Sequence, residues 1–176
     1  MCAFPCIHSG VDNSIRLWQI STGKAIGAVD NTHDEGTAIT SVAFGMKGCF
    51  LTSDTKGTTK MWNIGPSDFL LAQIQSFRNP SDSPSTSLAA TRYGMFVTGD
   101  DQGTVTVWSK SGNRRNMQAN RNSGSKNRDN SYTTQTSRSG GWYLNSVCRH
   151  AQGAIRSLSF RADGNLMAAA SEARVT

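Results

Sequence analysis

Residues 97–108 of this 176-residue chain read "VTGDDQGTVTVW" and contain the clearest indication of its fold. Apolar residues lead into Val97, a cluster of Gly, Asp and Gln follows, and Val105 and Val107 then alternate with polar residues up to Trp108. Alternation after a cluster of turn-forming residues is typical of a short β-strand that follows a tight turn. The tryptophan at the end of this run therefore raises the question of whether the pattern repeats.

The same pattern occurs twice more in the chain. Residues 9–18 read "SGVDNSIRLW" and residues 53–62 read "SDTKGTTKMW". Trp62 lies 44 residues after Trp18, and Trp108 lies 46 residues after Trp62. A period in the forties, with a tryptophan closing each short alternating run, indicates a repeat architecture built from β-strands.

Composition restricts the class of protein. The chain is 36% hydrophobic and contains 17 glycines, a balance that favours short strands and Gly-rich turns over helices. It has no run approaching the roughly 18 apolar residues that a membrane span needs. The first ten residues lack the basic and apolar regions of a secretory signal, and the four cysteines are scattered. We therefore expect a cytoplasmic protein without membrane contact, with the nucleus as the alternative compartment.

The positive charge is concentrated in one segment. Residues 110–138 contain seven basic residues and one acidic residue, whereas the rest of the chain balances 11 basic against 11 acidic residues. Around it, residues 109–141 are rich in Ser, Asn, Arg and Gly. Such a composition cannot bury enough apolar surface to offset its ordering entropy, so we predict a basic, disordered insertion.

Apolar residues with a period of two, bounded by turn signals, predict strands along the rest of the chain. We find no helical periodicity, and residues 76–87 have the Pro/Ser composition of a loop. The predicted strands are residues 15–20, 24–29, 39–44, 49–53, 58–64, 69–75, 86–91, 95–99, 104–109, 143–148, 155–160 and 166–171.

These features resemble the WD40 repeats of a β-propeller. Residues 33–64 are similar to nearly a full repeat, with His33, two strands around a Gly turn, and Trp62. Residues 150–171 are similar to the first half of another repeat. The resemblance implies an all-β fold: a WD40-type propeller segment of about two full and two partial blades in an incomplete ring.

The resemblance also divides the chain into three parts. Residues 1–108 would form a partial first blade, a second blade and the first three strands of a third. Residues 109–141 would be the insertion, and residues 142–176 would complete the third blade and begin a fourth. A chain that starts and stops within a blade would be part of a longer protein, a truncated product, or an arc that another chain completes.

The resemblance assigns structural roles to six residues: Asp12, Trp18, His33, Trp62, Trp108 and His150. Asp12 occupies the family's aspartate position, six residues before the tryptophan. In the next two repeats this position holds Lys56 and Gln102, and Asp54 and Asp100 lie two positions earlier. The third repeat lacks the histidine. We therefore expect the hydrogen-bonded His–Ser–Asp–Trp arrangement of the family to be incomplete and the blades to be held less firmly.

The sequence lacks the motifs that indicate a catalytic nucleophile, a phosphate-binding loop or a structural zinc site. It contains no G-x-S-x-G nucleophile motif and no Gly-rich phosphate-binding loop. Cys2, Cys6 and His8 supply only three candidate ligands, whereas a structural zinc site needs four. We therefore predict no catalytic residue, no metal and no cofactor, and a protein that is not an enzyme.

Loop residues are the candidates for binding partners. In the family, alternate loops share a rim, and here one rim would present Asp34, Glu35, Asp54, Lys56, Asp100 and Asp101 to another protein. The opposite rim would carry the basic insertion, whose candidates for polyanion binding are Arg114, Arg115, Arg121, Lys126 and Arg128. The insertion is equally consistent with a phosphorylated linker or with an unconstrained loop.

Together these observations predict a non-catalytic protein–protein scaffold, completed by a further chain segment or a partner within a larger propeller or complex. One alternative is an RNA-associated propeller in a ribosome or RNA-processing assembly that uses residues 110–138. A second alternative is a microtubule-associated or ciliary propeller, because residues 96–108 are faintly similar to repeats of echinoderm-microtubule-associated-like proteins.

Overall fold

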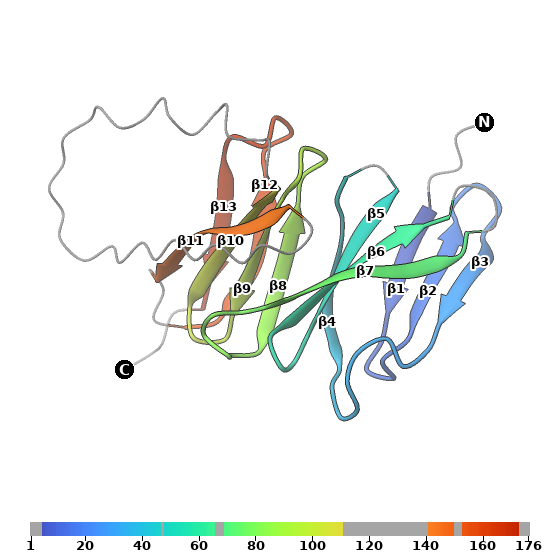
Figure 1. The fold of residues 1–176 in the computed structure, drawn as a ribbon, viewed down its shortest axis with the longest axis horizontal. Helices are drawn as coiled ribbons and strands as arrows, with labels where there is room; N and C mark the ends of the chain where they lie inside the picture. Colours follow the sequence, from blue (N-terminus) through green and yellow to red (C-terminus); the bar gives the residue numbers. More distant parts are fainter. Residues whose placement is uncertain (1–4, 47, 66–68, 111–140, 150–152, 173–176) are drawn as a thin grey trace, which may run out of the picture.

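The computed structural model describes residues 5–46, 48–65, 69–110, 141–149 and 153–172. Within these ranges every helix or strand assigned is a strand, and the thirteen strands form four antiparallel sheets (Figure 1). The described residues include no helix long and apolar enough to span a bilayer. The all-β prediction is therefore confirmed for this part of the chain.

Each sheet is built from strands that are consecutive in the chain. Sheet 1 contains β1 (Pro5–Ser9), β2 (Ile15–Gln19) and β3 (Lys24–Val29); sheet 2 contains β4 (Ile39–Phe44), β5 (Cys49–Asp54), β6 (Thr58–Ile64) and β7 (Leu71–Arg78). Sheet 3 contains β8 (Ser85–Ala90), β9 (Met95–Asp100), β10 (Thr104–Lys110) and β11 (Trp142–Arg149); sheet 4 contains β12 (Ile155–Phe160) and β13 (Met167–Ser171).

The predicted loop at residues 76–87 is shorter in the structure, where only residues 79–84 lie between β7 and β8. The prediction was wrong at both ends for a local reason. Phe77 continues the ladder opposite Thr59 and is buried, and Ser85 pairs with Asp100 while its small polar side chain is buried too. Because a buried serine is polar, this end of the strand lacks the alternation of apolar residues that indicates a strand in a sequence.

The four sheets stand side by side in chain order (Figure 1). Strand β8 contacts both β4 and β12, so the first strands of sheets 2, 3 and 4 are neighbours. The Thr86 hydroxyl donates to the Ile155 carbonyl at 2.6 Å, and the Ser87 hydroxyl donates to the same carbonyl at 2.9 Å. These bonds join sheet 3 to sheet 4.

A separate apolar core fills each junction between sheets. Ile15 and Leu17 of sheet 1 pack with Phe50 and Trp62 of sheet 2. The junction of sheets 2 and 3 contains Leu51, Met61, Phe77, Phe96, Trp108 and Trp142, and the junction of sheets 3 and 4 contains Ala89, Val97, Ile155 and Leu158. Full burial of each large apolar side chain contributes about 1.5–3 kcal/mol, so these cores are the main force that holds the sheets together.

Two of the three repeated tryptophans occupy equivalent places in these cores. Trp62 stacks on Phe50 with ring centroids 6.2 Å apart, and Trp108 stacks on Phe96 at 5.9 Å. Trp62 and Trp108 are 4% and 5% exposed, whereas Trp18 is 39% exposed. Trp18 differs because no described strand lies against its face of sheet 1, and Cys6 takes the place of the aromatic partner opposite it.

The turns between strands fall on two rims. The first rim carries the connections β1–β2, β3–β4, β5–β6, β7–β8 and β9–β10; the second carries β2–β3, β4–β5, β6–β7, β8–β9 and β12–β13, toward the top of Figure 1. Glycine is required in the first-rim turns at Gly57 and Gly103, which have φ of 76° and 79°. A Cβ on Gly57 would also clash with the Ser83 carbonyl oxygen.

Candidate functional site

A chain of buried polar side chains runs from the core of sheet 2 to the first rim. The Trp62 indole Nε1–H donates to Thr52 Oγ1 at 2.9 Å. His33, from the β3–β4 connection, lies between Thr52 and Asp54: its Nε2 is 2.8 Å from Thr52 Oγ1 and its Nδ1 is 2.8 Å from Asp54 Oδ2. The chain therefore connects a core indole with a carboxylate at the rim.

The donors and acceptors in this chain determine its hydrogen-bond directions. The Trp62 indole can only donate and a carboxylate can only accept. A neutral His33 with its proton on Nδ1 satisfies both ends, because Nδ1–H donates to Asp54 while Nε2 accepts the Thr52 hydroxyl proton. Every buried polar group in the chain is then paired, which is the condition for such a network to stabilise a fold.

Asp54 also organises the turn that follows it. Its Oδ1 accepts the backbone N–H groups of Lys56 and Thr58 at 2.9 and 2.8 Å. Burial alone would raise the pKa of the Asp54 carboxyl, but the hydrogen bonds from His33 and from these two amides outweigh it and hold this pKa below its usual range. The carboxylate thus holds the β5–β6 hairpin and the β3–β4 connection together.

Sheet 3 carries a partial copy of this network, displaced by 46 residues. Asp100 Oδ1 accepts the amides of Gln102 and Thr104 at 3.0 and 2.7 Å. Asn79 stands where sheet 2 has His33, and it accepts a bond from Thr98 Oγ1 at 2.8 Å. Trp108 Nε1 is buried without a hydrogen-bond partner among the described residues. The amide side chain therefore replaces only part of what the imidazole does.

The structure corrects the expectation that the buried arrangement is incomplete in the second repeat. Asp54 lies at the end of β5, and from there its carboxylate reaches both the turn amides and His33, although Lys56 occupies the expected position. The sequence signal for this network is the spacing of Thr52, Asp54 and Trp62, which recurs 46 residues later as Thr98, Asp100 and Trp108. For the third repeat, the missing histidine does break the network.

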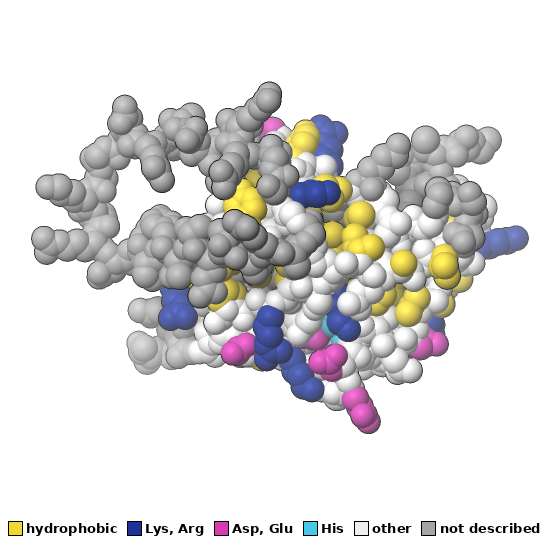
Figure 2. Space-filling view, viewed as in Figure 1, with side chains coloured by type: hydrophobic (Ala, Val, Ile, Leu, Met, Phe, Trp, Pro, Cys, Tyr) yellow, Lys and Arg dark blue, Asp and Glu magenta, His cyan; other side chains and the backbone are white. Residues whose placement is uncertain are grey.

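The six charged residues assigned to a partner-binding rim differ in their burial in the structure. Asp54 and Asp100 are buried, so their carboxylates belong to the interior and not to a contact surface. Asp34, Glu35 and Lys56 are exposed on the first rim, and Asp101 is half-buried there. The Lys56 ammonium donates to the Glu35 carbonyl at 3.1 Å, which joins two neighbouring connections. In Figure 2 charged side chains of both signs line the lower edge of the visible face.

Ion pairs locally neutralise several acidic side chains of the first rim. Arg16 pairs with Asp30 at 2.8 Å and Arg78 pairs with Asp82 at 2.8 Å. A third pair joins Arg156 to Glu172 at 2.7 Å. Asp12 bonds the Ser14 hydroxyl at 2.9 Å, and this hydrogen bond lowers the pKa of its carboxyl. Asp30, Asp82 and Glu172 therefore each have a cationic partner within the chain.

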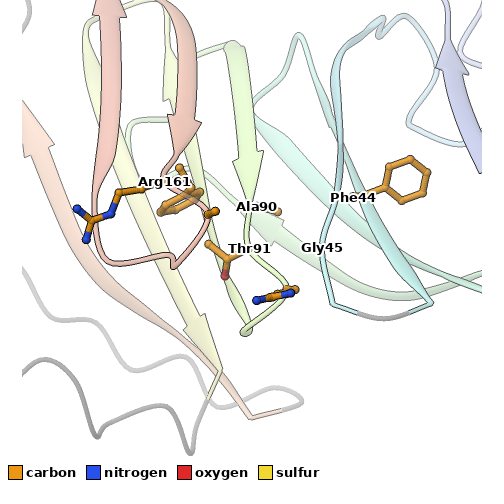
Figure 3. A pocket seen from close by; sticks show the side chains of 8 residues that line it. Phe44, Gly45, Ala90, Thr91 and Arg161 are labelled. Carbon is orange, nitrogen blue, oxygen red and sulfur yellow. The ribbon is translucent and has the colours of Figure 1, made fainter. Parts of the chain in front are cut away.

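The second rim contains a hollow of about 330 Å³ between three successive hairpins. Phe44, Ala90 and Phe160, the last residues of β4, β8 and β12, lie along it. In Figure 3 the side chains of Phe44 and Arg161 point outward on either side, so the space over Ala90 and Thr91 stays open.

Several predicted residues lie outside the described part of the chain. They are His150 and the polyanion candidates Arg114, Arg115, Arg121, Lys126 and Arg128, together with Cys2. Within the residues that the structure describes, no cluster of His, Cys, Asp or Glu could hold a metal ion.

Comparison with known families gives no match between this chain and a family model, and comparison with curated protein sequences gives no match either. The candidate site therefore depends on the chain's own geometry.

Proposed function

We propose that this chain is a segment of a WD40-type β-propeller and that it acts as a non-catalytic scaffold that binds other proteins. The observation that supports this most directly is the buried chain from Trp62 through Thr52 and His33 to Asp54, with its partial copy in sheet 3. Antiparallel sheets in chain order, each packed on the next, support the same assignment.

This architecture uses its buried polar groups for structure. His33 and Asp54, the pair that most resembles an acid–base site, are enclosed and fully hydrogen-bonded to their own repeat. A substrate could not reach them without breaking the hairpin that they hold. The groups left for an external partner are therefore those of the exposed loops, which is what a scaffold requires.

The first rim is the surface that we assign to a basic protein partner. Asp34 and Glu35 are exposed on the β3–β4 connection, and Asp101 lies on the β9–β10 turn. Both connections are held by buried carboxylates, so the exposed acids are presented on ordered backbone. Complementary charge at such a surface raises association rates and selects partners more than it raises affinity.

The exposed face of sheet 1 supports the proposal that this chain forms only part of a ring. Trp62 and Trp108 are each covered by the preceding sheet, and the more exposed Trp18 holds the same position on its own sheet. We propose that a further sheet, from another chain segment or from a partner, covers this indole in the complete assembly.

A peptide-binding experiment tests the scaffold proposal. A fluorescent ten-residue peptide of alternating Lys and Ser is titrated against the full chain and against the triple variant Asp34→Asn, Glu35→Gln, Asp101→Asn. Loss of three charge contacts predicts at least about tenfold weaker binding. The control is Asp163→Asn on the second rim, which should bind like the wild type. Equal affinity of the triple variant and the wild type would contradict the proposal.

A further inference from the structure

Exposed large hydrophobic side chains gather on the second rim. The exposed residues Ile20, Phe44, Leu70, Tyr93 and Leu166 all lie in its turns or at the strand ends beside them. Outside this rim the described residues have three more: Val11, Trp18 and Ile74. Figure 2 shows hydrophobic side chains over the middle and upper part of the visible face. A concentration of exposed apolar surface on one rim marks an interaction site.

The hollow between the hairpins lies within this apolar surface. Its floor is formed by Ala90 and Thr91, and the flanking positions come from the two neighbouring sheets. The Thr91 hydroxyl accepts the amides of Tyr93 and Met95 at 3.3 and 3.2 Å, so the β8–β9 hairpin is held by its own bonds. The hollow is therefore an open groove between three hairpins, and its volume of about 330 Å³ can take a few side chains of a bound segment.

A fixed cation stands at this groove. The Arg92 guanidinium lies 4.8 Å from the centroid of the Tyr93 ring and donates to its hydroxyl at 2.5 Å. The Tyr93 ring packs against the neighbouring hairpin, where a Cβ on Gly164 would be 3.1 Å from Tyr93 Cδ2. Glycine at this position thus lets the ring rest on the next hairpin and support the guanidinium above it.

The charge of the second rim is positive in the described residues. Lys24, Arg92, Lys110 and Arg161 lie on it against one acid, Asp163, which is bound to Arg161. That hydrogen bond lowers the pKa of Asp163 to about 2, so its charge remains committed to Arg161. No ion pair among the described residues includes Arg92, so its guanidinium is available to a carboxylate from outside.

We propose that the groove of the second rim binds an extended acidic segment of a partner protein that also carries aliphatic side chains. Its carboxylates pair with Arg92, and its apolar side chains cover Tyr93 and Leu166. A purely acidic ligand would leave this apolar surface in water, and a purely apolar one would bury the Arg92 charge unpaired. This inference rests on the proposed scaffold function in one respect, namely that the ligand is a segment of a protein. The site itself lies on the second rim, opposite to the rim assigned to a basic partner.

The test uses a fluorescent ten-residue peptide of alternating Glu and Leu, titrated against the full chain by fluorescence anisotropy. Loss of one charge-assisted contact predicts about tenfold weaker binding for Arg92→Gln. Leu166→Ser should weaken binding by about threefold or more, since it removes part of the apolar contact. The matched controls Arg149→Gln, on the first rim, and Ile74→Ser, on the outer strand of sheet 2, should bind like the wild type.

Comparison ligands make the result specific. A peptide of alternating Glu and Ser should bind at least about tenfold more weakly, since it keeps the charge and loses the apolar contact. Equal binding of this peptide, unchanged binding by Arg92→Gln, or equal loss in Arg149→Gln would each overturn the proposal. Tight binding of phosphatidylserine vesicles that Arg92→Gln abolishes, without peptide binding, would also overturn it in favour of a membrane ligand. The Lys–Ser peptide titration of the first rim is unaffected by any of these outcomes, so the two proposals fail separately.

Discussion

The imidazole of His33 and the carboxylate of Asp54 form a hydrogen-bonded pair at 2.8 Å, with only 4% and 1% of these residues exposed. The pair joins the β3–β4 connection to the β5–β6 hairpin, and through Thr52 it continues to the core indole of Trp62. A first-rim loop and a core junction are therefore parts of one network. Damage to that network should be measurable both in stability and in the order of the rim.

The Asp54 carboxyl predicts a stability loss in acid. Its pKa is held below the usual range in the folded state, so the unfolded chain takes up this proton first as the pH falls. The stabilisation is present above about pH 4, the ordinary pKa of an aspartate, and is lost as the pH falls through the lower folded value. Urea unfolding at a series of pH values should show a steeper acid loss for the wild type than for Asp54→Asn. Identical profiles for wild type and Asp54→Asn would refute this assignment.

The two buried tryptophans predict different costs for the same substitution. Trp62→Phe and Trp108→Phe remove the same volume from equivalent cores, but Trp62 Nε1 donates to Thr52, whereas Trp108 Nε1 has no partner among the described residues. Trp62→Phe should therefore reduce the free energy of unfolding by about 1 kcal/mol more than Trp108→Phe does. Equal losses in chemical denaturation would show that the indole hydrogen bond contributes nothing.

The basic insertion predicts a separable polyanion affinity. Residues 110–138 carry the net charge of +6 of the whole chain, so any salt-dependent RNA binding should reside there. Deleting residues 112–138 should abolish RNA retention at low salt and leave the Lys–Ser peptide titration of the first rim unchanged. If the deletion variant still binds RNA, the RNA-binding surface lies on the sheets. That result would favour the RNA-associated alternative, with a surface other than the insertion.

Part of this structure could be predicted from the sequence. The alternating runs and the spacing of Trp62 and Trp108 predict antiparallel strands and two equivalent cores, because period-two burial and a large aromatic wedge are local features. Strand β1 was not given a range, since "PCIHS" has little alternation and is a strand through its pairing with β2. Pairing of this kind is a tertiary effect that a local pattern does not contain.

The roles of the acids were harder to predict. Asp54 and Asp34 are equally polar in sequence, but one is enclosed by His33 and the turn amides, while the other is exposed on the rim. Which carboxylate turns inward depends on where the strand ends relative to the turn. The apolar side chains of the second rim, such as Phe44 and Leu166, were assigned to strands without any sign that they are exposed.

A double-mutant cycle on His33 and Asp54 measures whether a buried polar chain connects rim and core within a repeat. The free energy of unfolding is measured for the wild type, His33→Ala, Asp54→Ala and the double variant. We expect a coupling energy of about 2 kcal/mol, because each single change leaves the other buried group without its partner. Losses that add to within about 0.5 kcal/mol would contradict it.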